Sequence, residues 1–441
     1  MPDLNHCLST VWLVVLSVAA GTTATRTAAA AEGTGWRGDG TGRYAEAQPP
    51  LTWDLVAGAN ILWKTKVGKG QSTPVVADPG KGDKQRASMP RSQSILPGRI
   101  FVTAEPDKLL ALDRETGKLL WSTDNGYQSL PPGSTVSAKR PTTAPGCGYA
   151  TPTPVTDGSF VYACFGTGIV VGYDLAGSRR WIRHLDLPLL TEYGRSVSPV
   201  LAEGRLLVSL GGLVALDPQT GEILWQTLQA KPTYGTPVVA RIGDVAVAIT
   251  PNGDCVRVSD GKLLASGLAR GTYASPVVYA GRVYFVGPPA VAVRLPDQPG
   301  EKLVCEQLWE NDDLDGEFFA SPICHEGLVY CAANEGTLYV LEAGTGKLVF
   351  QQELEIRSAS GKPGREPANL YPSLTLAGAR LLLGNDAGET LVLAPGSQYR
   401  ELGRSYLDRG SGASPVPDGK MLFLRGGETL YGVGVVGQES R

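Results

Sequence analysis

The sequence is poor in the residues that most often carry catalysis or hold a metal ion. Its 441 residues include three histidines, and one of them, His6, precedes an apolar N-terminal stretch. The other two, His184 and His325, are far apart in the chain. A Ser-His-Asp site needs a histidine oriented by an acid, and metal sites favour clustered His and Cys. This scarcity argues against a hydrolase and against a histidine-based metal site.

Cysteines are also few and scattered. Seven occur, none adjacent to another and none in C-x-x-C spacing. Cys7 precedes the apolar stretch, so it does not resemble a lipoprotein attachment site. In an oxidising compartment the other six could form up to three disulfides, in 15 alternative connectivities, or remain buried apolar thiols, and the sequence leaves both open. These six are Cys147, Cys164, Cys255, Cys305, Cys324 and Cys331.

Neither sign of charge is in clear excess. Lys and Arg total 40, and Asp and Glu total 43. Nucleic acids and anionic membrane surfaces are bound by concentrated basic surface. We therefore expect no nucleic-acid partner.

The N-terminus has the pattern of a secretion signal. Residues 11–20, VWLVVLSVAA, are apolar but too few to span a bilayer, and the Ala-rich TAAAAEG that follows offers a cleavage site near Ala30 or Ala31. We predict a signal peptide over residues 1–31 and an exported protein, periplasmic or extracellular, that is not integral to the membrane after cleavage. Because no Lys or Arg precedes the apolar stretch, an uncleaved apolar anchor is the alternative.

Two phrases recur along the chain, separated by Gly-containing turns. The first is Ser or Thr, then Pro, then β-branched residues, as in STPVV (72–76) and YASPVV (273–278). The second is ALD-x-x-TG-x-x-LW, at 111–121 and 215–225. Repeats of about 40 residues result, and the first is lengthened by polar insertions at 78–98 and 125–150. The repeats start near residues 72, 152, 197, 235, 274, 320, 371 and 413, and LYPSL (370–374) is a degenerate copy.

Each repeat predicts a four-stranded antiparallel meander. Pro suits the first residue of a strand, the aspartate of the second phrase bonds nearby amides, and the glycine takes positive φ. One such sheet has two apolar faces and two open edges, and radial stacking of copies buries both. The sequence therefore predicts an all-β, eight-bladed β-propeller. We expect the aromatic residues that close the fourth strands to pack between blades: Trp121, Trp181, Trp225, Trp309 and Phe350.

The two ends of the chain are expected to share one blade. The last repeat ends at ETLYGVGVVG, without room for a fourth strand. The segment NILWKTKVG (60–68) carries the Trp signature but follows no repeat of its own, so it is predicted to close the last blade. This divides the chain into a signal peptide (1–31), an N-terminal extension (32–59), a propeller (60–434) and a C-terminal tail (435–441).

These phrases, together with WRGDGTGRY (36–44), resemble the secreted PQQ-like, or quinoprotein-like, β-propeller repeat proteins. The family includes an outer-membrane assembly factor and the quinoprotein alcohol dehydrogenases, and the resemblance implies eight blades. The dehydrogenases carry a disulfide between adjacent cysteines, a Trp beneath the quinone, an Asp base and carboxylate calcium ligands. This chain has no adjacent cysteines, and its acidic NDDLDGE (311–317) lacks the spacing of a calcium loop.

We therefore expect a non-catalytic binding or scaffolding module for a protein, peptide or carbohydrate partner, with no catalytic residue, metal or cofactor. The alternative is a dehydrogenase of alcohols or sugars that uses pyrroloquinoline quinone (PQQ) and calcium.

The predicted binding site is a rim around one end of the propeller axis. Loops from the fourth strand of one blade to the first of the next converge there, and function usually resides on loops held by a rigid scaffold. Tyrosine offers contact area and a hydrogen-bonding group at low entropy cost. Packing of loop against loop is the alternative role. The insertion at 125–150 and the segment 357–369 reach this rim. The predicted rim residues are Gln71, Tyr149, Tyr193, Arg195, Tyr234, Tyr273, Phe319, Asn369 and Tyr371.

Overall fold

The computed structural model describes residues 33–77, 98–134, 136, 140–144, 146–356 and 368–435. The predicted signal peptide lies outside these residues, as do most of the insertion at 78–98, most of the segment 357–369 and nearly all of the C-terminal tail. Within the described part, no helix has the length and apolar character needed to cross a membrane.

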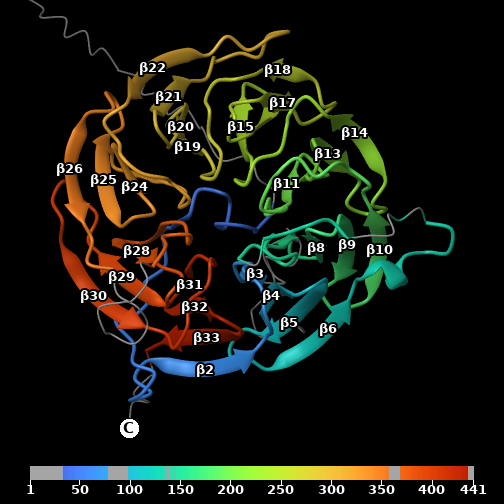
Figure 1. The fold of residues 1–441 in the computed structure, drawn as a ribbon, viewed down its shortest axis with the longest axis horizontal. Helices are drawn as coiled ribbons and strands as arrows, with labels where there is room; N and C mark the ends of the chain where they lie inside the picture. The colour runs from blue at the N-terminus through green and yellow to red at the C-terminus, as the bar shows by residue number, and fades with distance from the viewer. Residues whose placement is uncertain are drawn as a thin grey trace, which may run out of the picture.

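Eight sheets surround a central axis, and each contains a four-stranded antiparallel meander (Figure 1). The prediction of an all-β, eight-bladed propeller is confirmed. Apolar clusters lie between neighbouring blades, so each sheet buries both faces against its neighbours. The first four blades are β3 (Val75–Ala77), β4 (Arg99–Ala104), β5 (Lys108–Asp113) and β6 (Leu119–Asp124); β7 (Val155–Thr156), β8 (Phe160–Cys164), β9 (Ile169–Asp174) and β10 (Arg179–His184); β11 (Val200–Ala202), β12 (Arg205–Ser209), β13 (Leu213–Leu216) and β14 (Ile223–Thr227); and β15 (Val238–Ile242), β16 (Val245–Ile249), β17 (Cys255–Arg257) and β18 (Leu263–Ala265).

The remaining blades follow the same order, and a short 3-10 helix (Tyr127–Ser129) lies between the first and second blades. These blades are β19 (Val277–Tyr279), β20 (Arg282–Phe285), β21 (Ala290–Arg294) and β22 (Glu306–Asn311); β23 (Ile323–His325), β24 (Leu328–Ala332), β25 (Thr337–Glu342) and β26 (Leu348–Glu353); β27 (Thr375–Ala377), β28 (Arg380–Gly384), β29 (Glu389–Leu393) and β30 (Glu401–Tyr406), with β1 (Arg43–Tyr44) added to β27; and β31 (Val416–Asp418), β32 (Met421–Gly426), β33 (Thr429–Gly434) and β2 (Ile61–Lys66).

The eighth blade joins the two ends of the propeller. Its outermost strand, β2, pairs antiparallel with β33, from Ile61 opposite Val433 to Lys66 opposite Thr429. Figure 1 shows the blue β2 along the outer edge of the red β33. The predicted N-terminal closing strand is confirmed, and it leaves the ring without a gap between its first and last blades.

Tryptophans on several outer strands connect a blade to the next one. The indole N–H of Trp181 in β10 donates to Pro218 O at 2.8 Å, in the turn of the following blade. That turn contains Gly221 at φ +71°, where an added Cβ would lie 2.5 Å from the Trp181 ring. Trp121, Trp225 and Trp309 donate in the same way to Leu175 O, Val258 O and Ala343 O at 2.9–3.0 Å. The Trp and Gly of the repeated phrase are thus the two sides of one interblade contact.

A second set of interblade contacts surrounds the axis. In each blade the backbone N–H of a Ser or Thr donates to the side-chain hydroxyl of the equivalent residue in the next blade, at 2.7–3.1 Å. The last of these bonds, from Ser414 N to Thr73 Oγ1, closes the circle. We call this set the hydroxyl ring: Thr73, Thr153, Ser198, Thr236, Ser275, Ser321, Ser373 and Ser414.

The hydroxyl ring gives the Ser/Thr-Pro phrase its structural reason. The hydroxyl satisfies a buried backbone N–H of the preceding blade, and an unsatisfied buried N–H is costly. In the degenerate copy LYPSL the ring hydroxyl is Ser373, which follows Pro372 instead of preceding a proline. The proline indicates residue 371 as the ring position, so the structural register of that repeat is shifted by two residues.

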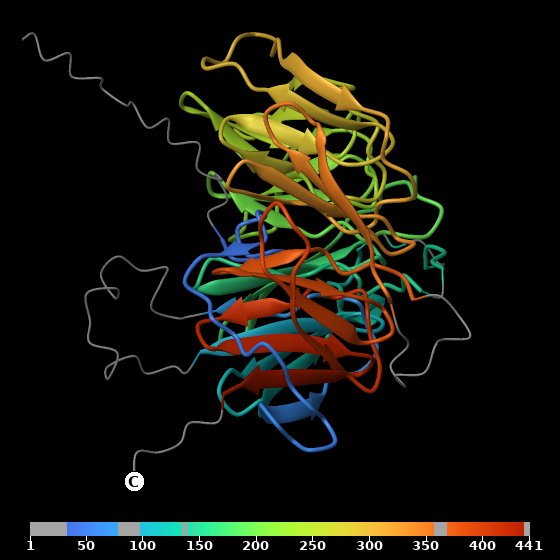
Figure 2. The same cartoon turned by 90° about the vertical axis from the view of Figure 1, so that its left-hand side faces the viewer.

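The N-terminal segment 33–60 packs along one end of the ring, shown in blue in Figure 2. Thr34 pairs with Thr156 in the second blade, and Arg43 and Tyr44 pair with the inner strand of the seventh. Between them the Arg37 side chain, 1% exposed, donates through Nη2 to Pro322 O at 2.6 Å. Burial lowers the pKa of this guanidinium to about 10. The segment therefore crosses the axis and ties blades on opposite sides together.

Candidate binding site at the axial rim

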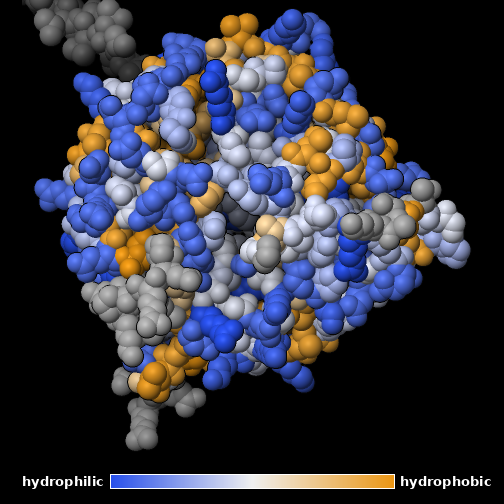
Figure 3. Space-filling view, in the orientation of Figure 1, coloured by the Kyte–Doolittle hydropathy of each residue, from blue (hydrophilic) through white to orange (hydrophobic). Residues whose placement is uncertain are grey.

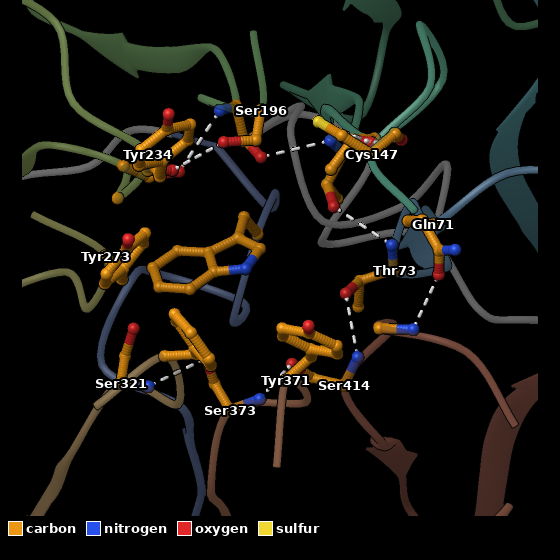
Figure 4. Close-up of a pocket in the computed structure, with 18 of the residues that line it drawn as sticks. Gln71, Thr73, Cys147, Ser196, Tyr234, Tyr273, Ser321, Tyr371, Ser373 and Ser414 are labelled. Carbon is orange, nitrogen blue, oxygen red and sulfur yellow. Dashed lines mark hydrogen bonds between the residues drawn. The ribbon is translucent and has the colours of Figure 1, made fainter. Parts of the chain in front are cut away.

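A cavity of about 710 Å³ occupies the axis at the end where the outer strand of each blade leads to the next blade. It is lined by all eight members of the hydroxyl ring, by the loops that precede them and by Trp36 of the N-terminal segment. Figure 3 shows a hollow near the centre of this face, and Figure 4 shows side chains from several blades surrounding it. The volume suits a small ligand or a few residues of an extended chain.

One side of the opening is an unbroken series of aromatic rings, which we call the aromatic arc: Tyr193, Tyr234, Tyr273, Phe319 and Tyr371. Successive ring centroids are 5.6, 5.2, 4.5 and 5.1 Å apart. Tyr234 and Tyr273 stack at 19°, whereas Tyr273 and Phe319 meet edge to face at 79°. Such contacts hold each ring in place against its neighbours. The arc is therefore a preformed aromatic surface.

The register of the hydroxyl ring explains where the arc comes from. The last four members of the aromatic arc each stand two residues before a residue of the hydroxyl ring. For example, Tyr273 stands two residues before Ser275, and Tyr371 two residues before Ser373. In the other four blades the same position holds Gln71, Thr151, Ser196 and Gly412. All eight positions line the cavity. The rim thus has an aromatic side and a side of small or polar residues, built on the same backbone position.

The hydroxyl ring forms a polar neck beneath the arc. Its eight side chains are buried, with exposures of 1–5%. Each hydroxyl oxygen accepts a backbone N–H, and within the described ranges no protein acceptor is recorded for the hydroxyl hydrogens. A hydroxyl can donate and accept at once. The neck can therefore offer donors to a group that enters the cavity.

The charged residues of the lining are both acidic. Glu317 and Asp386 line the cavity, and its described lining contains no Lys, Arg or His. Asp386 accepts the backbone N–H and the side-chain amide of Asn369, each at 2.8 Å. Burial, assisted by the carboxylates of Asp386 and Glu317, raises the pKa of Tyr371. The opening is therefore an environment that opposes additional negative charge.

The structure brings six of the nine predicted rim residues to the cavity and places three behind it. Arg195 is 4% exposed, and its guanidinium donates to Leu210 O at 3.1 Å, so it supports the loop backbone and offers little surface. The Tyr149 hydroxyl donates to Pro141 O at 2.9 Å, and Asn369 holds Asp386. The six that line the cavity are Gln71, Tyr193, Tyr234, Tyr273, Phe319 and Tyr371.

Several lining residues escaped the sequence interpretation. Thr151, Ser196 and Gly412 would have been found by counting two residues back from every ring hydroxyl. Glu317 lies in a loop outside the repeated phrases, and Asp386 lies in the Gly-containing turn between β28 and β29. Trp36 comes from the N-terminal segment, which reaches the axis through contacts far apart in the chain, such as Arg37 with Pro322. No local pattern predicts such a contact.

The residues of the cavity do not fit PQQ. This quinone is a tricarboxylate, and the described lining supplies two carboxylates and no cation to receive it. Among the described residues, no group of three or more His, Cys, Asp or Glu could hold a metal ion. The acidic segment 311–317 is engaged locally, with Asn311 Nδ2 donating to Gly346 O at 2.7 Å and Asn311 Oδ1 accepting Asp313 N at 2.8 Å.

The comparisons with known proteins agree with this architecture. The family model described as outer membrane protein assembly factor BamB matches residues 56–272. The chain therefore resembles the PQQ-like β-propeller repeat proteins. The outer membrane protein assembly factor BamB of Yersinia pestis is 23% identical over 339 residues, which cover 67% of this chain and 81% of the relative. The factor of the same name from Shewanella oneidensis is 21% identical over 280 residues, covering 60% and 64%.

Two solved structures share the fold of this propeller. BamB from Moraxella catarrhalis superimposes with a TM-score of 0.55 at 11% identity, over 86% of this chain and 100% of that one. The computationally designed Ika8 protein gives a TM-score of 0.50 at 13% identity, over 84% and 99%. At these identities the likeness concerns the fold alone.

Proposed function

We propose that this chain is an exported, non-catalytic propeller that binds and scaffolds a protein partner at its axial rim. The carrying observation is the aromatic arc, in which five rings in mutual contact border a cavity on a closed ring of blades. The relatives named outer membrane protein assembly factor BamB favour a protein partner over a carbohydrate.

The physics of recognition supports this use of the arc. Tyr is enriched among the residues that dominate protein interfaces, because it buries a large area at a low cost in side-chain entropy. Tyr193 and Tyr371 are 44% and 45% exposed, so a partner can still cover them. The hydroxyl ring beneath holds the loops that carry these rings, which lowers the entropy cost of binding. A rigid apolar surface with polar groups at its edge is suited to binding a peptide segment.

Catalysis receives no comparable support from the cavity. Among its described lining residues the nucleophilic candidates are hydroxyls and the thiol of Cys147, and no histidine stands beside them. Cys147 is not activated, because burial raises the pKa of its thiol. A direct check is to incubate the purified protein with PQQ and calcium. Retained quinone absorbance with dye-linked alcohol oxidation would replace the binding proposal by the dehydrogenase alternative.

The proposal is tested by removing two adjacent rings of the arc. The double variant Tyr234→Ala/Tyr273→Ala should capture at least tenfold less partner in a pull-down from the native envelope fraction, because two central anchors are lost. Its melting temperature should stay within a few degrees of the wild type. The matched control is Leu120→Ala/Leu224→Ala, which removes two exposed side chains from outer strands. Unchanged capture would show that the two rings do not bind the partner, and a parallel loss of capture and melting temperature would show that they are structural.

A further inference from the structure

The chemistry of the cavity selects among the segments that a partner could insert. Its described lining combines the aromatic arc, the carboxylates of Glu317 and Asp386, and the hydroxyl ring, without a basic side chain. Aromatic faces carry negative potential and attract cations, and carboxylates do the same. The hydroxyl ring can donate or accept at the neck and does not select between charges. The rings and the carboxylates favour a positively charged group and disfavour an anion.

Two buried arginines beside the cavity, Arg425 and Arg195, do not reverse this preference at its surface. The guanidinium of Arg425 lies behind the wall, 3% exposed, and donates to Thr103 O at 2.9 Å and Gly68 O at 2.9 Å. Arg195 is held in the same way by carbonyl oxygens. Their N–H groups are directed to the protein backbone, whereas the carboxylate of Glu317 belongs to an exposed residue. A ligand in the opening therefore meets acidic and aromatic groups first.

We propose that the axial cavity accepts the side chain of a lysine or arginine carried by an extended segment of the partner, with the ammonium or guanidinium held between Glu317 and the ring faces of the aromatic arc. This inference rests on the proposed function and names the ligand chemistry of the same site. The Tyr273 side chain is central to it, because that tyrosine contacts rings on both sides and stands in the electrostatic field of Glu317. Figure 4 shows Tyr273 at the edge of the opening.

The test uses three fluorescein-labelled octapeptides that differ only in a central Lys, norleucine or Glu. Fluorescence anisotropy with the full propeller should give at least tenfold tighter binding for the Lys peptide than for the norleucine peptide, and weaker binding still for the Glu peptide. Affinity for the Lys peptide should fall as salt rises from 50 to 300 mM, by roughly threefold or more, because salt screens charge attraction.

Paired variants separate this mechanism from general charge. Glu317→Gln should weaken binding of the Lys peptide by about fivefold to tenfold and leave the norleucine peptide unchanged. The control Asp313→Asn removes the same charge four residues away, outside the cavity, and should change neither peptide by more than twofold. Equal affinity for the Lys and norleucine peptides would overturn the cation inference while leaving the proposed function intact. If Tyr234→Ala and Tyr273→Ala both capture the native partner as well as the wild type does, the proposed function is wrong.

A second inference comes from two cysteines in neighbouring blades. Cys255 lies in β17 of the fourth blade, and Cys305 immediately precedes β22 of the fifth. Both belong to one apolar cluster, and their side chains are hydrogen-bonded to each other. Other buried thiols are directed to backbone oxygens, as Cys164 is to Val197 O at 3.5 Å and Cys331 to Tyr339 O at 3.8 Å. Cys255 and Cys305 are thus already placed as partners.

The backbone around this pair explains the contact. Leu303 N donates to Leu264 O at 2.9 Å, and Lys262 forms an ion pair with Glu301, so segment 301–305 runs beside β18 in parallel order. Two residues beyond Leu303 and Leu264, this order brings Cys305 beside residue 266. Cys255 pairs with the neighbouring Ala265 across the β17–β18 ladder. The strand register therefore places Cys255 and Cys305 at the same end of β18.

We infer that Cys255 and Cys305 form a disulfide that joins the fourth and fifth blades when the chain meets an oxidising compartment. The oxidant is an external disulfide, of a protein or a small molecule. The thiolate of the more accessible Cys305 attacks one external sulfur, and a mixed disulfide forms as the first external thiolate leaves. The sulfur of Cys255 then attacks Cys305 and releases the second external thiolate, which takes the proton of Cys255. Two protein thiols and one disulfide thus give one protein disulfide and two thiols.

The hydrogen bond between the two thiols prepares the first step. It lowers the pKa of Cys305, because the Cys255 S–H donates to the Cys305 thiolate, and a larger thiolate fraction reacts faster with disulfides. The opposite shift follows for Cys255, whose pKa is raised by the same bond and by burial. Cys305 is therefore the attacking residue and Cys255 the resolving one.

The disulfide is tested on full-length protein purified without reductant and alkylated in denaturant with N-ethylmaleimide. Peptide mass spectrometry should find Cys255 linked to Cys305 in protein exported to an oxidising compartment and in reduced protein treated with oxidised glutathione. Dithiothreitol should lower the melting temperature of the wild type by several degrees, because reduction removes the disulfide that constrains the unfolded chain. It should not change the melting temperature of Cys255→Ser/Cys305→Ser, because that variant has no such disulfide. If both cysteines are alkylated by N-ethylmaleimide after glutathione treatment, they have remained free thiols, and this inference is wrong.

Discussion

Two sets of aromatic residues recur with the same period in this propeller, and they have different environments. The outer tryptophans are largely buried, and the indole N–H of Trp181 finds a carbonyl in the next blade. The members of the aromatic arc contact one another, and Tyr193 and Tyr371 remain nearly half exposed. Outer tryptophans occur on both halves of the ring, whereas the arc follows only one side of it.

The difference shows which repeated positions carry the fold. An outer Trp is matched by a Gly in the neighbouring blade, so a change on either side breaks a contact between blades. The position two residues before each ring hydroxyl has no such partner, and the chain places Tyr in one blade and Gly412 in another. Because the hydroxyl ring holds the backbone at every blade, the side chains above it can vary without altering the architecture.

The largest expected effect is loss of an outer interblade contact. Trp181→Ala should lower the free energy of unfolding by about 3–5 kcal/mol, because it empties a buried site and removes a hydrogen bond to Pro218 O. Gly221→Val should also destabilise strongly, because its Cβ would overlap the Trp181 ring. The measurement is urea denaturation followed by far-UV circular dichroism. The two changes should be less than additive when combined, and full additivity would show that the residues act independently.

The hydroxyl ring should give intermediate losses that are the same on both sides of the rim. Ser275→Ala, below the arc, and Ser198→Ala, below the polar side, should each cost about 1–3 kcal/mol, because each leaves a buried backbone N–H of the preceding blade without an acceptor. Ser275→Thr keeps the hydroxyl and serves as the control in calorimetric melting. Clearly unequal costs for the two alanine variants would mean that the ring is not a uniform scaffold.

The smallest change in stability is expected where the polar side is given an aromatic ring. An added Cβ at Gly412 would meet Tyr371 Cβ at 3.6 Å and Gln71 Oε1 at 3.4 Å, which are ordinary contacts. Gly412→Tyr should alter the free energy of unfolding by less than about 0.5 kcal/mol. It should strengthen binding of the Lys octapeptide by about threefold, since the arc then extends into the eighth blade. Gly412→Ser, which adds a side chain without a ring, should leave binding unchanged.

The fold was predictable because its signals are local and repeated. The Trp, Gly and Ser/Thr-Pro residues contact the same partners in successive blades, so their spacing reports the architecture directly. The closing strand was also readable, since Trp63 in β2 carries the outer-strand signature away from any repeat. In the degenerate unit the proline misled the register by two residues, because the interblade bond is made by the hydroxyl of Ser373, which follows the proline.

The rim was predictable in part. The positions of its aromatic residues follow from the repeat register, whereas its acidic character depends on residues in the loops. Tyr234 and Tyr273 follow from the position two residues before the ring hydroxyl, whereas Tyr149 stands four residues before Thr153 and lies behind the cavity. Arg195 resembled a rim cation, but its guanidinium satisfies backbone carbonyls. The acidic character of the opening depends on Glu317, which lies in a loop outside the repeated phrases, and on Asp386, which lies in the Gly-containing turn between β28 and β29.

The pairing of β2 with β33 also sets the order in which this molecule can be completed. The outermost strand of the eighth blade is synthesised first and its partner last, so the wheel remains open until nearly the whole chain has emerged. A chain that stops before residue 429 keeps an exposed sheet edge at each side of the gap, a substrate for proteases and for aggregation. Premature termination near the C-terminus is therefore as damaging to the assembled ring as loss of its beginning.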